Sequence, residues 1–184
     1  MINGLTDLLH PCQVMADLQT IAEKRPLAES VIAYVGDGNN MANSLLNGAA
    51  VLGLELRLAT PESHRPARRV RKRAEEIAAR SGARISWSED PVDAVRGAHF
   101  VYTDVWTSMG QEAEHQMRLE LFQPYQVNAE LMRHAPEAWV MHCLPAHRGE
   151  EITDEVIESE DSIVFDQAEN RVHAQKAVLY QLLA

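Results

Sequence analysis

The chain has 184 residues, of which 46% are hydrophobic, and it carries a formal net charge of −10 at pH 7. This length and composition suit one domain with a real hydrophobic core. The acidic balance argues against nucleic acid as a partner, because a phosphate backbone requires a basic surface. No stretch approaches the ~18 consecutive apolar residues of a membrane span, and the first residues do not resemble a secretory signal. With only two cysteines, Cys12 and Cys143, we expect a cytoplasmic protein without a disulfide framework.

The apolar residues predict helices and strands that alternate along the chain. A helix opened by Pro11 comes first, and an unbroken apolar run at 31–35 then predicts a buried strand. Further along we predict helices near 41–52, 70–81 and 128–134, strands near 54–58, 85–87, 99–103 and 139–142, and a weaker strand candidate at 162–165. This alternation predicts an α/β fold, a doubly wound Rossmann-like parallel sheet with helices on both faces.

Polar clusters follow three of the predicted strands. Asn39 and Asn40 come after the first strand, Asp104 and Ser108 come after the fourth, and the segment 143–148 comes after the fifth. Ligands of doubly wound sheets bind beyond the carboxyl ends of the strands, where the strand order reverses. We therefore expect the three clusters to meet along one edge of the sheet.

The string GDGNNM at 36–41 lies where a dinucleotide-binding fingerprint would lie. Met41 occupies the position of the third glycine, and Asp37 places a side chain where a pyrophosphate needs bare backbone. A nicotinamide dehydrogenase is therefore a weak alternative. The asparagines can instead bind a carboxylate or an amine at a helix N-terminus, or cap the helix. We expect that one caps and the other binds.

Two further strings each have a simple structural alternative. In DVWTSMG at 104–110, Asp104 can form a charge-assisted hydrogen bond with a ligand amine, or the loop can only cap the next helix. In HPCQ at 10–13, His10 and Gln13 are one helical turn apart and can reach one small ligand, or they can serve as local caps. The acidic residues at 150–155 are most simply a loop and a helix start.

The string HCLPAHRG at 142–149 allows three interpretations. A metal site of His142, Cys143 and His147 is disfavoured, because adjacent residues of a continuing strand point to opposite faces. In addition, no second pair of cysteines or histidines has the spacing that is typical of a zinc site. A nucleophilic Cys–His pair fails for the same reason unless His147 folds back. Cys143 can instead lie beside a substrate amine, or it can be an ordinary buried cysteine.

Five strings in this order resemble ornithine carbamoyltransferase. They are HPCQ at 10–13, GDGNN at 36–40, the loop at 104–110, HCLP at 142–145 and AENR at 168–171. The resemblance covers essentially the whole chain, and five ordered strings are highly specific. The loop at 104–110 looks like the ornithine-specific loop that separates this family from the aspartate enzymes.

By this resemblance, the head group of L-ornithine would contact Asn40, Asp104, Ser108 and Met109, with Asp104 at its α-ammonium. The catalytic Cys143 would lie beside the reacting δ-amine. That amine has a pKa near ~10.4 and must lose a proton before it attacks, and a thiolate or a carbonyl beside it can accept or orient the proton.

The same resemblance places carbamoyl phosphate against His10, Gln13, Cys143, Leu144 and Arg171. Attack of the δ-amine on the carbamoyl carbon would expel phosphate and give citrulline, a step of arginine biosynthesis. Arg171 and His10 would stabilise the charge that develops on the carbonyl oxygen. No metal ion and no organic cofactor is implied.

The resemblance also implies a domain division. Residues 1–165 correspond to the ornithine-binding domain, with its first helical segment within 1–28, and residues 166–184 to a helix that packs on the family's carbamoyl-phosphate domain. The phosphate-binding string Ser-x-Arg-Thr-Arg of that domain does not occur in these 184 residues, so we expect the chain alone to be inactive. The family is trimeric, and an apolar stripe on the last helix predicts self-association of this chain.

Two other functions use the same residues. One is a non-catalytic amino-acid-binding module, and the other is a carbamoyltransferase for a related amine such as putrescine. Asp104 and Ser108 favour a head group that bears both ammonium and carboxylate, which putrescine lacks.

Overall fold

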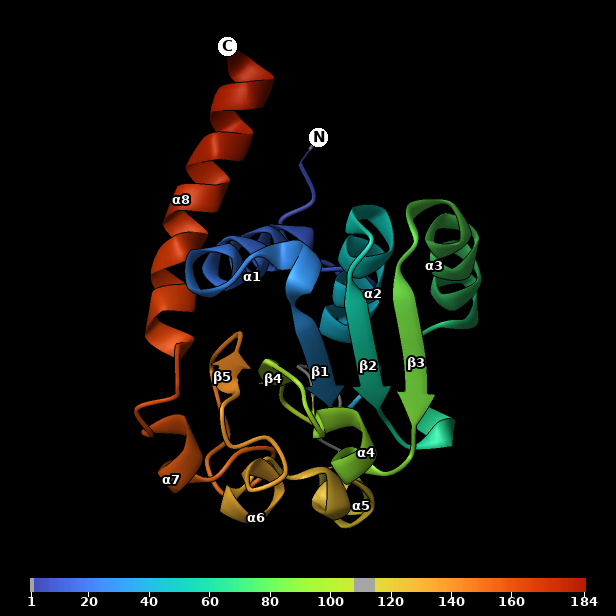
Figure 1. The fold of residues 1–184 in the computed structure, drawn as a ribbon, viewed down its shortest axis with the longest axis vertical. Helices are drawn as coiled ribbons and strands as arrows, with labels where there is room; N and C mark the ends of the chain where they lie inside the picture. The colour runs from blue at the N-terminus through green and yellow to red at the C-terminus, as the bar shows by residue number, and fades with distance from the viewer. Residues whose placement is uncertain (1, 108–114) are drawn as a thin grey trace.

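The computed structural model describes residues 2–107 and 115–184. Five parallel strands form one sheet in the order β3-β2-β1-β4-β5 (Figure 1). The strands are β1 Val31–Val35, β2 Glu55–Ala59, β3 Arg84–Ser88, β4 Phe100–Thr103 and β5 Trp139–His142. The helices are α1 Pro11–Lys24, α2 Asn40–Leu52, α3 Arg68–Ser81, α4 Pro91–Val95, α5 His115–Phe122, α6 Ala129–Met132, α7 Asp154–Ile157 and α8 Val164–Leu183.

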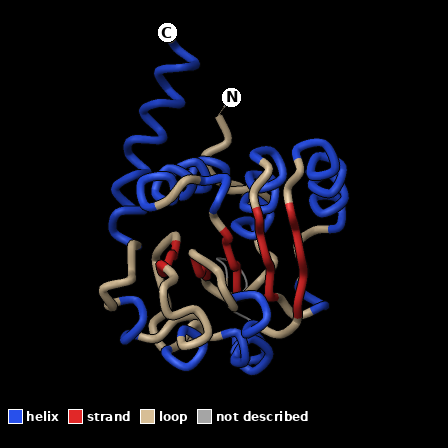
Figure 2. Tube along the Cα trace, viewed as in Figure 1, coloured by secondary structure: helices blue, strands red, loops and turns tan. Residues whose placement is uncertain are grey.

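Side chains alternate between the two faces of the sheet, and each face has its own hydrophobic core. Ile32 and Tyr34 of β1 pack with apolar residues of α1, α2 and α3, whereas Ala33 and Val35 pack with those of α4 to α7. This division follows from the two-residue period of a strand. Figure 2 shows the helices ranged around the strands. The doubly wound α/β prediction is confirmed.

One predicted strand is wrong, and one predicted helix is shorter than expected. The candidate strand at 162–165 contributes only an isolated bridge between Ser162 and Val140, and α8 begins at Val164. The Ile163 N–H still bonds the Val140 carbonyl, but the Ile163 carbonyl already accepts the helical bond from Gln167. The helix predicted at 128–134 reduces to α6, whose first turn is capped by the Asn128 side chain.

The strand order reverses beside β1. The chain proceeds outward from β1 to β2 and β3, and then crosses to β4 and β5 on the other side. Val35 at the end of β1 is in register with Thr103 at the end of β4. The loop after β1 and Asp104 after β4 therefore adjoin at the switch point, where ligands of such sheets bind.

Helix α8 packs on the domain along its first half and extends beyond it in its second half (Figure 1). Gln167, Asn170 and Ala174 are buried, mainly on the side of α1. Large apolar side chains of the same helix are exposed; they are Phe165, Val172, Leu179, Tyr180, Leu182 and Leu183. Among the described residues, no helix has the length and apolar character to cross a membrane.

We expect the exposed end of α8 to drive self-association, because apolar area left in water costs about 25 cal/mol per Å². Replacing both Leu182 and Leu183 by glutamine should shift the chain toward monomer in sedimentation velocity at micromolar concentration. The same replacement of Val51 and Leu52, which are exposed apolar residues of α2, should leave the distribution unchanged. A parent chain that is already monomeric would contradict the expectation.

Candidate functional site

The loop after β1 is shaped by close backbone contact. A Cβ atom on Gly38 would lie 2.2 Å from the backbone oxygen of His64, and the Gly38 N–H donates to that oxygen at 2.8 Å. The side chain of Asn39 accepts from the N–H groups of Met41 and Ala42, so it caps α2. The Asn40 amide donates to the Thr6 carbonyl at 2.8 Å. Asn39 is therefore the capping asparagine.

A buried ion pair holds this loop against α5. The Arg118 guanidinium contacts the Asp37 carboxylate, and its Nε donates to the Trp106 carbonyl at 2.6 Å. Burial raises the pKa of Asp37 to about 6, although the positive charge of Arg118 opposes this shift. The pair therefore fixes the position of the segment that follows β4 relative to the loop that follows β1.

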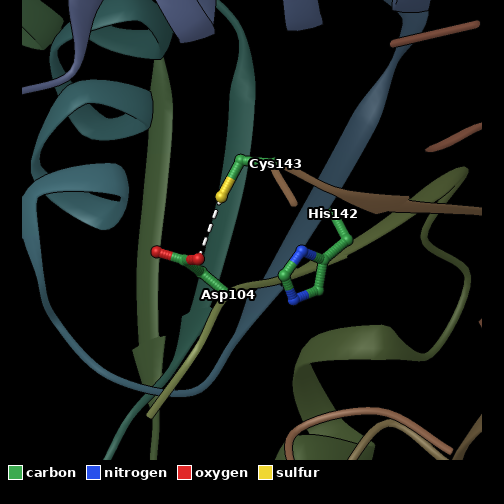
Figure 3. Close-up of side chains that lie close together, drawn as sticks. All are labelled: Asp104, His142 and Cys143. Atoms are coloured by element: carbon green, nitrogen blue, oxygen red, sulfur yellow. Dashed lines mark hydrogen bonds between the residues drawn. The ribbon is translucent and has the colours of Figure 1, made fainter. Parts of the chain in front are cut away.

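Asp104 joins the ends of β1, β4 and β5. Its carboxylate is buried and accepts from the Asn39 amide at 2.7 Å and from the Cys143 thiol at 2.9 Å. Figure 3 shows the thiol of Cys143 directed at this carboxylate. Burial, together with the neighbouring Asp104 charge, raises the pKa of Cys143 well above its ordinary value. The cysteine is therefore a neutral thiol in this state and not the thiolate considered from the sequence.

His142, the last residue of β5, forms hydrogen bonds that hold the loop after this strand. The Leu144 N–H donates to Nδ1 of His142 at 2.9 Å, so Nε2 carries the proton of the neutral ring and faces Glu151 Oε1 at 3.1 Å. β5 ends at His142, and Cys143 leaves the strand rather than continuing it. The sulfur, one His142 nitrogen and one Asp104 oxygen consequently lie within 4.8 Å of one another. Both ring nitrogens of His142 are nevertheless engaged, which leaves none for a metal ion.

A cavity of about 600 Å³ lies above these strand ends. Its lining includes His10, Asn40, Asp104, Cys143 and Leu144. Leu144 turns the chain at the rim with a φ of 54°, which is uncommon for a residue with a Cβ atom. The structure thus gathers five of the residues selected from the sequence around one cavity of ligand size.

His10 precedes α1 and faces the cavity. Its backbone N–H donates to the Ser44 hydroxyl at 2.7 Å, and its Nδ1 lies 2.9 Å from the Gly4 carbonyl. Because a carbonyl only accepts, Nδ1 carries the proton and Nε2 of the neutral ring is an acceptor. Burial, reinforced by the charge of Arg171, lowers the pKa of His10. The neutral ring is therefore the favoured form.

Gln13 and Arg171 meet beside the cavity rather than in its lining. An Arg171 Nη1–H donates to Gln13 Oε1, which joins α1 to α8. The amide nitrogen of Gln13 donates in turn to Asp17 at 2.8 Å. Gln13 is thus oriented by Asp17, and its oxygen is left to hold Arg171. Ser108 and Met109, the other two predicted ligand residues, lie outside the residues that the structure describes.

Asp17 is the principal site residue that sequence reasoning missed. It is fully buried and accepts from Gln13, from Gln167 at 2.7 Å and from Tyr102 at 3.1 Å. Gln167 also accepts from the backbone N–H of His142 at 3.0 Å, so the network connects α1, β4, β5 and α8. Its only sequence signal was an aspartate four residues after Gln13, on a helix whose other buried positions are mostly small or apolar.

The fold and the site together define the class of this domain. It is a doubly wound α/β domain with a buried carboxylate and a thiol at the switch point of its sheet. The model of the aspartate/ornithine carbamoyltransferase family, Asp/Orn binding domain, matches residues 28–182. The chain belongs to this family.

The chain is also similar to individual members of the family over nearly its full length. It is 60% identical to an ornithine carbamoyltransferase of Gloeobacter violaceus, in an alignment that includes 100% of this chain and 59% of that relative. The solved ornithine carbamoyltransferase from Pyrococcus furiosus superimposes with a TM-score of 0.90 at 54% identity, over 96% of this chain and 57% of that one. For the anabolic enzyme from Campylobacter jejuni the TM-score is 0.94 at 38% identity, over 98% and 61% of the two chains. The chain therefore spans about three fifths of the length of these relatives.

Asp17→Asn should change how stability depends on pH. Burial raises the pKa of Asp17 to about 7 in the folded chain, compared with about 3.9 for an exposed aspartate. The folded chain therefore keeps a proton that the unfolded chain releases, and the free energy of unfolding falls as pH rises from about 4 to 7. The variant lacks this titration, so its stability relative to the parent should rise by roughly a few kcal/mol over that window.

Chemical denaturation at several pH values measures this difference. Asp93→Asn, at an exposed side chain, is the control and should give a difference that does not vary with pH in this way. A pH-independent difference for Asp17→Asn would show that Asp17 is ionised throughout.

Proposed function

We propose that this chain is the ornithine-binding domain of an ornithine carbamoyltransferase, which transfers a carbamoyl group from carbamoyl phosphate to the δ-amine of L-ornithine. The products are citrulline and phosphate. The observation that carries the proposal is the buried Asp104 carboxylate, placed in the lining of a cavity of about 600 Å³ together with His10, Asn40 and Cys143. The identity with relatives that are named ornithine carbamoyltransferase supports it.

Asp104 is suited to bind the α-ammonium of ornithine. A buried carboxylate is stabilised most by a charged donor, and its present donors, the Asn39 amide and the Cys143 thiol, are both neutral. An ammonium group would replace the thiol at Asp104 Oδ1 and keep the amide at Oδ2. Asn40 supplies a further amide to the head group, and by resemblance Ser108 and Met109 complete this part of the site.

Cys143 and Leu144 are suited to the reacting δ-amine. The raised pKa of Cys143 means that its neutral thiol cannot accept the proton that the δ-ammonium must lose. The arrival of that cation lowers the pKa of the thiol, since a nearby opposite charge favours the thiolate. We therefore propose that the Cys143 thiol releases its proton to solvent as the δ-ammonium binds, and that the resulting thiolate then accepts one proton from the δ-ammonium, giving the thiol and the free amine. The Leu144 carbonyl orients that amine.

The carbamoyl end of carbamoyl phosphate would lie against α1. The unprotonated Nε2 of His10 can accept from the carbamoyl NH₂ group. Arg171, held by Gln13, can stabilise the negative charge that develops on the carbonyl oxygen. The phosphate contacts, and the homo-oligomer that the resemblance implies, are assigned to the whole protein. In the whole protein, the helix formed by residues 166–184, which belongs to α8, would pack on the carbamoyl-phosphate domain.

Asp104→Asn should weaken ornithine binding more than Cys143→Ser does. Removing the carboxylate removes a charge-assisted bond worth about 1.5–3 kcal/mol, which corresponds to a loss of about tenfold to a hundredfold in affinity. Serine keeps a neutral donor at position 143, so its main effect should be on chemistry. Calorimetry with ornithine measures both affinities, and putrescine serves as the matched ligand without a carboxylate. Equal ornithine affinity in the parent and in Asp104→Asn would remove Asp104 from the binding site.

The 184 residues produced alone should form citrulline at a negligible rate. Each missing electrostatic donor to a transition state commonly costs ~10²–10³-fold in rate, and the phosphate-binding string of the family is not among these residues. Citrulline should be measured with ornithine and carbamoyl phosphate, using a full-length relative as the positive control. Turnover at an ordinary enzymatic rate of ~10 s⁻¹ would contradict this expectation. Ornithine binding without turnover would agree with the proposed domain.

A further inference from the structure

A second cluster of ionisable side chains lies at the rim of the cavity. The turn after β5 carries His147, Glu150 and Glu151, and one ligand atom of each lies within 4.8 Å of the others. His115, at the start of α5, lies beside this group: its Nε2 is 3.5 Å from Glu150 Oε1, but it is not one of the residues whose ligand atoms all lie within 4.8 Å of one another. On the other side of the same carboxylate, His147 Nδ1 is 3.6 Å from Oε2. His115 and His147 both line the cavity.

The two glutamates of this cluster each have a buried oxygen that the described residues do not satisfy. Glu151 is fully buried, and its Oε1 accepts from the His147 N–H at 2.6 Å and from His142. Its Oε2, and likewise Oε2 of Glu150, are buried without a hydrogen-bond partner among the described residues. Two adjacent carboxylates with buried, unsatisfied oxygens repel each other and are costly unless a cation joins them.

The distances and donor types indicate which cation fits. Zn²⁺ binds imidazole nitrogen and carboxylate oxygen at about 2.0–2.2 Å, so its ligand atoms lie roughly 3.4 Å apart in a tetrahedral site. The separation of 3.6 Å between His147 Nδ1 and Glu150 Oε2 is close to that value and is long for a hydrogen bond. His115 Nε2 lies 3.5 Å from the other oxygen of the same carboxylate, Oε1. Two imidazoles with two carboxylates suit a divalent transition ion better than Ca²⁺ or Mg²⁺, which prefer an all-oxygen set.

The orientation of His115 agrees with such a role. Its Nδ1 lies 3.2 Å from the Thr107 hydroxyl, which leaves Nε2 directed at Glu150. An outer partner of this kind commonly fixes the tautomer and the ring orientation of a metal-binding histidine.

We propose that His115, His147, Glu150 and Glu151 form a binding site for a divalent transition ion of the Zn²⁺ type at the rim of the cavity. The ion joins the start of α5 to the turn after β5, and its ligands are other residues than those proposed for carbamoyl transfer. The site does not include Asp104, His142 or Cys143, although Glu151 contacts His142.

Calorimetric titration of the 184-residue chain with Zn²⁺ tests this site. His147→Ala and Glu150→Gln should each weaken Zn²⁺ binding by at least about tenfold. His173→Ala is the matched control, because His173 and Glu169 form a similar pair at 3.7 Å on α8 that belongs to no group of three mutually close ligand side chains among the described residues; it should bind Zn²⁺ like the parent. Cys143→Ser should also keep the parent affinity. If His147→Ala does not fold, as judged by metal-free thermal melting, His115→Ala at a partly exposed ring takes its place with the same expected loss.

Co²⁺ provides a second measurement. The Co²⁺-loaded chain should show d–d absorption without thiolate-to-metal charge transfer, because the proposed ligands contain no sulfur. The proposal is overturned by such charge transfer, by Zn²⁺ binding that is lost in Cys143→Ser and kept in Glu150→Gln, or by the absence of saturable binding. Since none of these measurements depends on ornithine or on citrulline, their failure leaves the proposed function untouched.

Discussion

The hydrogen bonds of Asp104 with Asn39 and Cys143 hold the site together, because they join the carboxyl ends of three strands through one buried carboxylate. Asn39 accepts from the first N–H groups of α2 with its oxygen, so its amide nitrogen can only point toward Asp104. The start of the helix and the position of the carboxylate are therefore one arrangement. A ligand that binds Asp104 therefore contacts a residue that is hydrogen-bonded both to the N-cap residue of α2 and to the first residue after β5.

Three buried aspartates surround this edge, and their different partners give them different tasks. Asp37 pairs with the guanidinium of Arg118 and fixes two loops. Among the described residues, the donors to Asp17 are two amides and a phenol, all of them neutral. Burial raises its pKa to about 7, and it orients Gln13. Asp104 faces the cavity with neutral donors that a cationic ligand can displace. An acidic chain can thus bury carboxylates when each has a defined set of donors.

The turn after β5 is held by a buried contact and lines the cavity. Its base is the buried contact of His142 with Glu151, which sets the tautomer of the ring and leaves the Leu144 N–H bonded to Nδ1. Beyond that contact, Cys143 and Leu144 of the turn line the cavity, and the far end of the turn carries the proposed metal ligands around Glu150.

The local pattern of apolar residues was sufficient to predict the fold class and most strands, because a short apolar run such as 31–35 between polar segments is typical of a buried strand. It also selected Asp104, Asn40 and Cys143, since residues that follow parallel strands must meet at one edge. Only the tertiary structure decided which asparagine caps α2, that Cys143 leaves β5, and that 162–165 joins a helix. Asp17 shows the reason most clearly: its partners Tyr102 and Gln167 are 85 and 150 residues away. Hydrogen-bond partners at such separations are set by tertiary packing, and a local sequence pattern does not predict them.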